Sequence, residues 1–437
     1  MDYRESLSYL EGLNVFGSKL GLSRIERLTE LLGHPERRYR TVHVTGTNGK
    51  GSVSAMTAAI LTKSGLKTGL YTSPHLTAYT ERFVIDGEQA SEADFAAAIS
   101  AAKEAAEAML AEGAEQPTEF EVLTAAAFVY FAEKAVDYAV IEVGLGGLLD
   151  STNVIMPEVS VITNVALEHA DRCGGTLAGV ARHKAGIIKA GVPVVTAAEG
   201  MPLDVLRQKA EEEGSDIFVL GEDFCVAPPK KADAGKGEIE FSSELLGIRA
   251  ARYALALGGA YQRKNAALAV MAAALLAAAH PSITQAAIAA ALAEVKWPGR
   301  FERFTLAGTT VVVDGAHNPA GAAALRESLD ACFPDEARVF LLGILADKDC
   351  AAMLRTLLRA GDRVVITRPF SERAGDPEDL ARLAREITGE VEVVRAADEA
   401  LTRALAWVTE ERILCAAGSL YLIGELRRSL LERGGFA

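Results

Sequence analysis

A glycine-rich segment with one lysine and several hydroxyl groups is where this sequence first indicates chemistry. Gly46-Thr47-Asn48-Gly49-Lys50-Gly51-Ser52 follows the apolar residues 41–45 and precedes a helical stretch. A strand, a glycine turn and a helix in this order present backbone N–H groups and the positive end of a helix to an anion. Lys50 can neutralise the outer phosphates of a nucleotide, and Ser52 or Thr47 can reach a metal ion or a phosphate oxygen. The segment therefore predicts a nucleotide-phosphate site.

The spacing within this loop differs from that of the common phosphate-binding loop. In G-x-x-x-x-G-K-[ST] the hydroxyl residue directly follows the lysine, whereas here Gly51 intervenes and the hydroxyl comes at Ser52. An ordinary strand-to-helix turn is the weaker interpretation, because glycines beside the lysine lower the stability of the helix start. The loop is therefore expected to be a nucleotide site of a different kind.

Polar side chains at further strand ends extend this expectation. Ser73 follows the apolar residues 69–71, Glu142 closes an apolar run, and Glu168 and His169 come shortly after another. Ligands bind at the carboxyl ends of strands in open parallel sheets, and a buried carboxylate without a partner is costly. These groups could together hold Mg²⁺, although histidine is an unusual ligand for an ion that prefers oxygen. Taken singly, Glu142 and His169 are more typical of hydrogen-bonded structural residues.

The elements that must position these groups follow a regular alternation. Short apolar runs alternate with helical stretches, which predicts an α/β architecture with parallel sheets covered on both faces. Strands are expected at residues 41–45, 138–143, 159–164 and 192–196. After the Pro-Gly pair at 298–299, five more are expected at residues 309–314, 338–342, 363–367, 391–394 and 413–416. We therefore expect a second, smaller domain from about residue 297, and β-hairpins or loops appended to the first domain over residues 216–250.

Composition supports a two-domain globular protein and argues against several other classes. The chain has 437 residues, of which 50% are hydrophobic and 24% charged, and this length is too great for one ordinary core. A formal net charge of −14 without a basic stripe argues against a nucleic-acid binder. The alanine-rich segments are too short to cross a membrane, and the charged N-terminus does not resemble an export signal. Five scattered cysteines fit reduced thiols, so we expect a cytoplasmic protein.

Several motifs occur in order along the chain, namely Gly46–Ser52, Ser73–Leu76, Glu142–Gly147, Leu149–Val154, Lys184–Ile187, Asp314–Pro319 and Gly418–Leu422. The series resembles the folylpolyglutamate synthase/dihydrofolate synthase family, in the Mur ligase superfamily of ATP-dependent amide-forming ligases. The resemblance spans nearly the whole chain. It implies a P-loop-type parallel-sheet ATPase domain with a folate site over residues 1–296, and a Rossmann-like glutamate ligase domain over residues 297–437.

The resemblance also implies roles for individual residues. Lys50, His169 and Lys184 are implied to be catalytic, with Lys184 carrying a carbamate, although its spacing alone would suggest a solvated charge near a helix end. Two Mg²⁺ ions are implied to bind Ser52, Ser73, Glu142, His169 and the carbamate of Lys184. ATP is implied to lie between the domains, in contact with Thr47, Asn48, Gly49, Lys50, Gly51, Ser52, Gln262, Asn265, Arg300, Asp314 and His317.

A site for the folate or pteroate is implied by three patches, namely Leu20, Gly21 and Leu22, then Thr118, Glu119, Phe120 and Glu121, then Leu149, Asp150 and Ser151. Phe120 could stack on a flat pterin and Asp150 could accept hydrogen bonds from it, although core packing explains Phe120 and Leu149 equally well. Three positions depart from the family, because Leu148, Glu168 and His183 stand where Arg, Asp and Glu are usual. Leu148 removes a charge beside the pterin patch, which keeps open a Mur-type ligase for a different carboxylate.

The expected reaction is amide formation through an acyl phosphate. ATP would phosphorylate a carboxylate of dihydropteroate or a reduced folate, and the amine of L-glutamate would then displace the phosphate. The protein is expected to be a monomer. A P-loop kinase or switch-type NTPase fits less well, because Ser52 is shifted and a second α/β domain follows. A catalytically silent binding module also fits less well, because the candidate metal and phosphate ligands are intact.

Overall fold

A computed structural model of the chain describes residues 1–13, 19–168, 172–227, 237–306, 308–409 and 411–435. These residues form two compact units. The first unit holds most of the chain up to Val295, and the second holds Ala254–Arg263 together with the chain from Lys296 onward. The segment Ala254–Arg263 therefore packs with the C-terminal unit although it precedes the expected boundary near residue 297.

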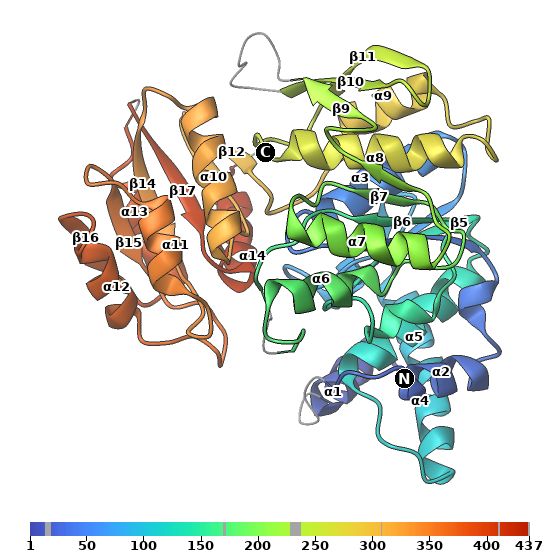
Figure 1. Ribbon diagram of the computed structural model, residues 1–437. Coiled ribbons are helices and arrows are strands. Elements are labelled where there is room, and N and C mark those ends of the chain that lie inside the picture. The colour runs from blue at the N-terminus through green and yellow to red at the C-terminus, as the bar shows by residue number, and fades with distance from the viewer. Residues whose placement is uncertain (14–18, 169–171, 228–236, 307, 410, 436–437) are drawn as a thin grey trace. The chain divides into compact units, whose positions relative to one another are not determined.

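An eight-stranded sheet organises the first unit (Figure 1). Its order is β4-β3-β2-β5-β1-β6-β7-β8, and all neighbours from β2 to β8 pair in parallel. The two edge strands β3 and β4 pair antiparallel. The expected parallel strands are thus confirmed. The strands are β1 (Arg40–Thr45), β2 (Thr68–Tyr71), β3 (Phe83–Ile85), β4 (Glu88–Gln89), β5 (Tyr138–Glu142), β6 (Val159–Ile162), β7 (Val194–Thr196) and β8 (Ile217–Val219).

Helices cover both faces of this sheet, with α3 and α8 on one side and α5 and α6 on the other (Figure 1). Every residue of β5 is buried, and this continuous burial is the reason that the strand is apolar up to Glu142 at its end. The helices and 3₁₀ turns are α1 (Tyr3–Leu13), α2 (Ser23–Leu31), η2 (Pro35–Arg37), α3 (Lys50–Lys63), η3 (Tyr79–Arg82), α4 (Glu92–Ala111), α5 (Glu119–Glu133), η4 (Ser151–Val154), α6 (Leu177–Ala185), α7 (Met201–Glu212), α8 (Gln262–Leu276) and α9 (Gln285–Glu294).

The expected β-hairpins over residues 216–250 are found only in part. β8 joins the main sheet beside β7 in parallel. The following strands form a separate three-stranded sheet with the order β11-β10-β9, in which β9 and β10 are antiparallel. These strands are β9 (Cys225–Ala227), β10 (Gly237–Ser243) and β11 (Ile248–Leu255).

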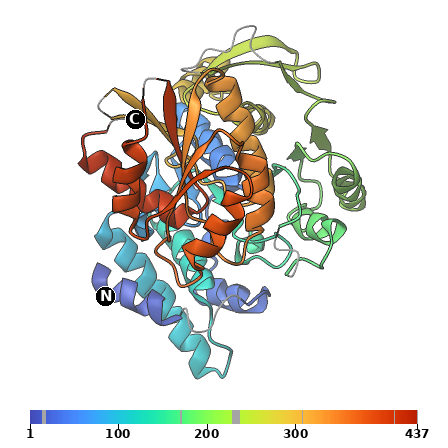
Figure 2. The same cartoon turned by 90° about the vertical axis from the view of Figure 1, so that its left-hand side faces the viewer.

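A six-stranded sheet with the order β12-β13-β17-β14-β15-β16 organises the second unit. Only the edge strand β12 is antiparallel to its neighbour, and the other neighbours pair in parallel. Helices lie on both sides of the strands (Figure 2). The five strands expected after residue 297 are confirmed. The elements are β12 (Glu302–Leu306), β13 (Thr309–Val313), α10 (Pro319–Cys332), β14 (Ala337–Leu342), α11 (Cys350–Leu357), β15 (Arg363–Ile366), α12 (Pro377–Arg385), β16 (Glu390–Val393), α13 (Ala397–Leu405), β17 (Arg412–Ala417) and α14 (Leu420–Glu432).

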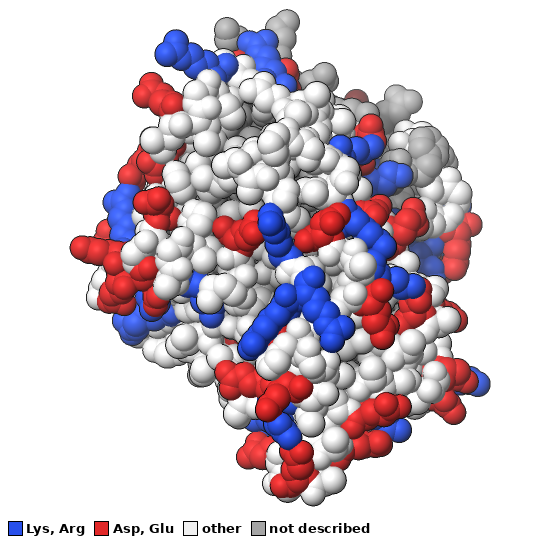
Figure 3. Space-filling view, turned by 90° about the vertical axis from the view of Figure 1, so that its right-hand side faces the viewer, with Lys and Arg blue, Asp and Glu red and all other residues white. Residues whose placement is uncertain are grey.

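Three further features of the structure concern its cysteines, the length of its apolar helices and its surface charges. All five cysteines are free thiols. Within the described ranges, no helix combines the length and apolar character needed to cross a bilayer. Figure 3 shows Lys and Arg side chains interspersed with Asp and Glu on the face that it presents.

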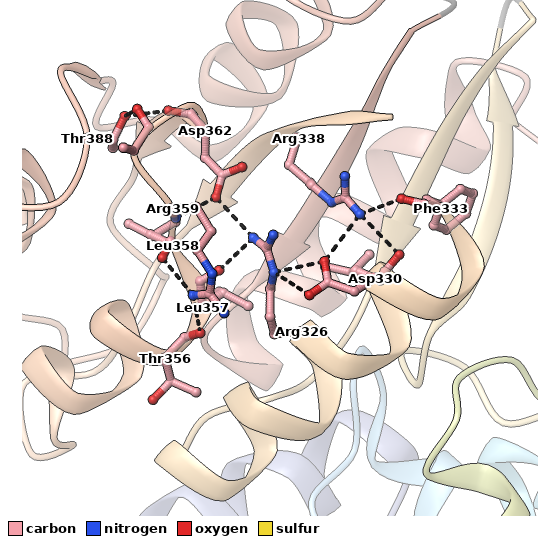
Figure 4. Close-up of polar contacts among 12 residues, drawn as sticks. Arg326, Asp330, Phe333, Arg338, Thr356, Leu357, Leu358, Arg359, Asp362 and Thr388 are labelled. Atoms are coloured by element: carbon pink, nitrogen blue, oxygen red, sulfur yellow. Dashed lines mark hydrogen bonds and ion pairs between the residues drawn. The ribbon is translucent and has the colours of Figure 1, made fainter. Parts of the chain in front are cut away.

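A buried ionic cluster ties α10 to the strands of the second unit (Figure 4). Arg326 of α10 donates to Asp362 Oδ2 and to the Leu357 carbonyl oxygen, both at 3.1 Å. Its Nε also donates to Asp330 Oδ2 at 3.1 Å. Arg338 of β14 donates to Asp330 Oδ1 at 3.3 Å. The side chains of Arg326 and Asp362 are only 12% and 7% exposed, whereas that of Asp330 is 48% exposed, so it is the Arg326–Asp362 pair that is held away from water.

Arg326→Met is therefore expected to lower the free energy of unfolding by about 3 kcal/mol, because it leaves the buried carboxylate of Asp362 without its cationic partner. Urea unfolding followed by circular dichroism measures this loss. Arg382→Met is the control, since Arg382 pairs with Asp379 at 2.6 Å on the surface, where the side chains are 73% and 69% exposed, and such pairs contribute little. Equal losses in both variants would contradict a stabilising role for the cluster.

Candidate active site

The glycine loop lies between the end of β1 and the start of α3, as the sequence predicts. Gly46 and Gly49 have φ angles of +154° and +89°, which glycine adopts without strain. Space also requires glycine, because a Cβ atom on Gly46 would lie 1.8 Å from Thr163 Oγ1, and one on Gly49 would lie 2.5 Å from Asn265 Oδ1. Lys50 Nζ donates to the carbonyl oxygens of Gly46 and Thr47 at 3.2 and 3.3 Å. The lysine thus lies across the loop at the helix N-terminus.

Glu142 and Ser73 meet beside this loop. β1 and β5 are parallel neighbours in which Val44 is opposite Glu142, so Glu142 ends its strand at the same edge of the sheet as the loop. The Ser73 N–H donates to Glu142 Oε2 at 3.1 Å. Glu142 and Ser52, the latter in the first turn of α3, are 4% and 1% exposed. The structure therefore brings a carboxylate and a serine main chain together beside the glycine loop.

The side-chain oxygens beside the glycine loop are the candidate ligands for a metal ion. Within the described ranges no group of three or more His, Cys, Asp or Glu side chains could hold a metal ion. Hydroxyl oxygens from Ser52 and Ser73 with the Glu142 carboxylate are nonetheless the hard oxygen ligands that Mg²⁺ takes when substrate phosphates and water complete its shell. His169 lies outside the described residues. The oxygen donors present therefore fit Mg²⁺ bound together with a nucleotide.

Lys184 lies in the last turn of α6 and is only 5% exposed. Its Nζ makes no hydrogen bond to any residue within the described ranges. Burial, followed by the positive charge of Lys50, lowers the pKa of Lys184 to about 7, while Cys173 and Glu168 act in the opposite direction. An amine with this pKa is substantially neutral near pH 7 and is therefore nucleophilic.

Three predicted ATP residues lie together in the second unit. Asp314 follows β13 and accepts hydrogen bonds from Tyr261 OH at 2.6 Å, from Phe301 N at 2.8 Å and from Ala316 N at 2.8 Å. A Cβ atom on Gly315 would lie 1.8 Å from Arg300 Nη1, so the guanidinium packs against this glycine.

His317 Nδ1 lies 2.8 Å from the Gly315 carbonyl oxygen. This contact requires a proton on Nδ1, which leaves Nε2 as an acceptor in the neutral ring. Of the two remaining predicted residues, Asn265 lies beside Gly49 in the first unit, and Gln262 is fully buried at the start of α8.

The three predicted folate patches lie close to one another. Gly21 N donates to the Leu149 carbonyl oxygen at 3.4 Å, which joins the first patch, Leu20 to Leu22, to the third. The Phe120 ring packs so closely on Gly144 that a Cβ atom there would lie 2.5 Å from Cζ. Tyr71 stacks on Phe120 with ring centroids 6.2 Å apart. Leu148 and Leu149 are 43% and 37% exposed, so an apolar surface accompanies these patches.

Acidic residues of these patches also make structural contacts. Asp150 accepts from Leu145 N at 2.8 Å and from Thr152 N at 3.0 Å, and burial raises its pKa. Thr118 caps α5, and its N–H donates to Glu121 Oε2 at 2.7 Å. Glu121 also pairs with Arg24 at 3.0 Å, and Glu119 accepts from Tyr79 OH at 2.7 Å. Ser151 begins the turn η4 and is buried.

Sequence reasoning missed the residues that hold these groups in place. Tyr261 and Arg24 fix Asp314 and Glu121, and Thr163 and Asn164 contact the glycine loop. Arg24 and Tyr261 carry no motif that would mark them. Asn164 could have been found, because it ends the strand expected over residues 159–164, and ligands bind at such strand ends in open parallel sheets.

Both parts of the sequence match known protein domains. The sequence matches the Mur ligase middle domain over residues 44–273 and the Mur ligase glutamate ligase domain over residues 299–420. It is 38% identical over 435 residues to folylpolyglutamate synthase of Lacticaseibacillus casei, covering 99% of each chain. The chain belongs to the folylpolyglutamate synthase/dihydrofolate synthase family of Mur ligases.

Other relatives of this family are similar over the same length. Dihydrofolate synthase/folylpolyglutamate synthase of Bacillus subtilis is 34% identical, with 98% of this chain and 99% of that protein covered. The structure of Mycobacterium tuberculosis folylpolyglutamate synthase with ADP and AMPPCP has a TM-score of 0.87 at 33% identity, covering 98% of each chain. Escherichia coli FolC in complex with DHPP and ADP has a TM-score of 0.86 at 28% identity, covering 99% of each chain. The expected α/β fold is confirmed.

Proposed function

We propose that this chain is an ATP-dependent ligase that joins a carboxylate of dihydropteroate or a reduced folate to the amine of L-glutamate. The observation that carries the proposal is the glycine loop with Lys50, which lies beside the buried Glu142 at one edge of the sheet. Relatives named for both activities match over almost the whole chain. Structures of relatives that hold ADP have the same fold and support ATP as the co-substrate.

The reaction consists of two displacements. A carboxylate oxygen of the acid attacks the γ-phosphorus of ATP, and ADP leaves. The amine of L-glutamate then attacks the acyl carbon and loses a proton, and phosphate leaves with one oxygen of the original carboxylate. No side chain has to act as a nucleophile, so the chain contributes positioning and charge neutralisation. Lys50 and the N–H groups at the start of α3 would hold the outer phosphates.

We propose two Mg²⁺ ions at Ser52, Ser73, Glu142, His169 and a carbamylated Lys184. When bound, these ions would neutralise charge on the transferred phosphoryl group. The buried neutral amine of Lys184 supports the carbamate, because reaction with CO₂ would turn a poor ligand into a carboxylate that Mg²⁺ accepts.

The remaining predicted residues would bind the organic parts of the substrates. Asn48, Gly49, Gln262 and Asn265 are proposed to complete the ATP site, and Arg300, Asp314 and His317 to contact ribose and adenine. The pterin is proposed to meet Phe120 and Leu149. Residues 1–296 would thus hold the phosphates of ATP and the folate, and residues 297–437, the glutamate ligase domain, would contact the rest of the nucleotide.

We further propose that the protein is a cytoplasmic monomer that does not bind nucleic acid. Five free thiols support a reducing compartment, and the mixed charges in Figure 3 support the last point. A ligase for a different carboxylate is the alternative function. The exposed Leu148 favours it, since an apolar residue stands at the pterin patch where the family usually has Arg.

Phosphate release is expected only when ATP, L-glutamate and a pterin-containing acid are all present. The assay measures phosphate with dihydropteroate or with tetrahydrofolate, each with and without glutamate, and identifies the product by mass. Glutamate-dependent release with either acid supports the proposal and decides between the two substrates. ATP turnover that neither acid nor glutamate changes would contradict it, and turnover that requires a different carboxylic acid in place of both would favour the alternative.

A further inference from the structure

The side chain of Asn164 makes two hydrogen bonds with the main chain of the glycine loop. Its Oδ1 accepts a hydrogen bond from the Asn48 N–H at 3.0 Å, and its Nδ2 donates to the Asn48 carbonyl oxygen at 3.0 Å. One amide side chain therefore bonds both main-chain groups of a single loop residue. The amide of Asn carries a donor and an acceptor on the same planar group, which lets it make both of these bonds at once.

The turn that follows β6 adds further contacts on either side of this pair. Thr163 Oγ1 donates to the Asn48 carbonyl oxygen at 2.6 Å. The Thr47 N–H donates to the Asn164 carbonyl oxygen at 2.9 Å. Thr47 Oγ1 donates to the Ala166 carbonyl oxygen at 3.1 Å and accepts a hydrogen bond from the Ala166 N–H at 3.0 Å. Through these hydrogen bonds, residues 163–166, which we call the β6 turn, fix the conformation of residues 47 and 48.

The position of these contacts gives them a functional consequence. They end at Asn48, and the next residues are Gly49, in a left-handed conformation, and Lys50, where α3 begins. A loop with glycines at both ends has many accessible conformations, and ordering it when a ligand binds costs free energy. Hydrogen bonds that fix Thr47 and Asn48 beforehand would remove part of that cost, because less of the loop would have to be ordered when the anion binds.

We propose that Asn164 is a positioning residue that holds the glycine loop ready for nucleotide phosphates before the nucleotide binds. This inference rests on the proposed ATP site. Asn164 acts through Asn48 and needs no contact with the nucleotide. Its loss should weaken nucleotide binding, whereas a bound nucleotide would restore most of the loop geometry, so turnover at saturating ATP should change little.

The test compares Asn164→Ala with Thr196→Ala. Thr196 of β7 is a matched control, because its buried hydroxyl also donates to one main-chain carbonyl, that of Ile162 at 2.7 Å, and accepts from one N–H, that of Ala198 at 3.0 Å. Both variants lose two bonds to the main chain of the same unit. Only Asn164→Ala loses bonds to the glycine loop.

Asn164→Ala is expected to raise the Kd for ADP and the KM for ATP by about tenfold to thirtyfold, as two lost hydrogen bonds would. Its kcat is expected to stay within about threefold of wild type, and its KM for glutamate should not change. Thr196→Ala should lower the melting temperature as much as Asn164→Ala and leave the Kd for ADP unchanged. If Asn164→Ala does not fold, Asn164→Ser replaces it, since serine is too short to make both bonds.

Hydrogen exchange in the nucleotide-free protein separates this inference from the proposed function. Exchange of the loop amides at residues 47–51 is expected to be faster in Asn164→Ala than in wild type or Thr196→Ala. Unchanged loop exchange, or an unchanged Kd for ADP, would overturn the role of Asn164. A wild-type protein that does not bind ADP would overturn the proposed ATP site, whatever the exchange shows.

Discussion

Lys50→Met is expected to slow glutamate-dependent phosphate release by about 10²- to 10³-fold, the size of effect seen when one group that stabilises transition-state charge is removed. Lys50 begins α3, and its ammonium group lies across the glycine loop on the carbonyl oxygens of Gly46 and Thr47. Charge develops on the transferred phosphoryl group, and a fixed positive charge beside it lowers the barrier. Methionine keeps the length of the side chain and removes the charge.

The control for this variant lies at the other end of the same helix. Lys63 ends α3, pairs with Glu294 at 2.6 Å and is 42% exposed. An exposed pair of this kind contributes little, so Lys63→Met should retain the wild-type rate and the wild-type melting temperature. Initial rates of phosphate release at saturating substrates measure both variants. A wild-type rate in Lys50→Met would contradict the assignment of the phosphates to this loop.

The parallel strands of both sheets could be predicted because their physical signal is strong. A strand buried on both faces carries a continuous apolar run, as residues 138–141 of β5 and 339–342 of β14 do. The short antiparallel edge strands could not be predicted in this way. β4 consists of Glu88 and Gln89, both exposed, and its polar residues do not distinguish a strand from a turn. The contacts of Ala254–Arg263 with the second unit also depend on tertiary packing, which has no local signal.

Some residues of the candidate site could likewise be predicted from the sequence, and the contacts of others could not. Gly46 and Gly49 could be predicted, because a turn of this shape beside a helix start requires glycine at both positions. The contacts of Asp150 and Glu121 could not, because the sequence does not distinguish an acid that faces a ligand from one that accepts main-chain hydrogen bonds at a turn or helix start. The lowered pKa of Lys184 depends on burial and on Lys50, which lies far away in the sequence.

Lys184→Ala is expected to reduce turnover by about 10²- to 10³-fold, and small carboxylates such as acetate are expected to restore part of it. Lys184 is buried at the end of α6 without a hydrogen-bond partner among the described residues, so a charged ammonium group would be poorly stabilised there. As a carbamate the same side chain would be an anionic oxygen ligand. Removing it would leave a cavity of a size that a small carboxylate can enter and partly replace.

Carbamylation has a readout that does not require turnover. In ¹³C-bicarbonate, the wild-type protein should give a carbamate carbon signal that Lys184→Ala lacks. With a pKa of about 7, the amine is about one tenth neutral at pH 6 and about nine tenths neutral at pH 8. Since only the neutral amine attacks CO₂, the signal should grow from pH 6 to pH 8 at a fixed CO₂ pressure.

Lys189→Ala is the control for the carbamate signal. Lys189 is also partly buried, and burial lowers its pKa, but its Nζ donates to the Asn153 carbonyl oxygen at 3.1 Å, a kind of bond that Lys184 does not make within the described ranges. The Lys189→Ala protein should therefore keep the wild-type carbamate signal. Full activity in Lys184→Ala, or a carbamate signal that Lys189→Ala removes and Lys184→Ala keeps, would contradict the assignment. The contrast tests whether a buried amine that makes no hydrogen bond within the described ranges, rather than any lysine near this helix end, is what makes the residue at position 184 reactive.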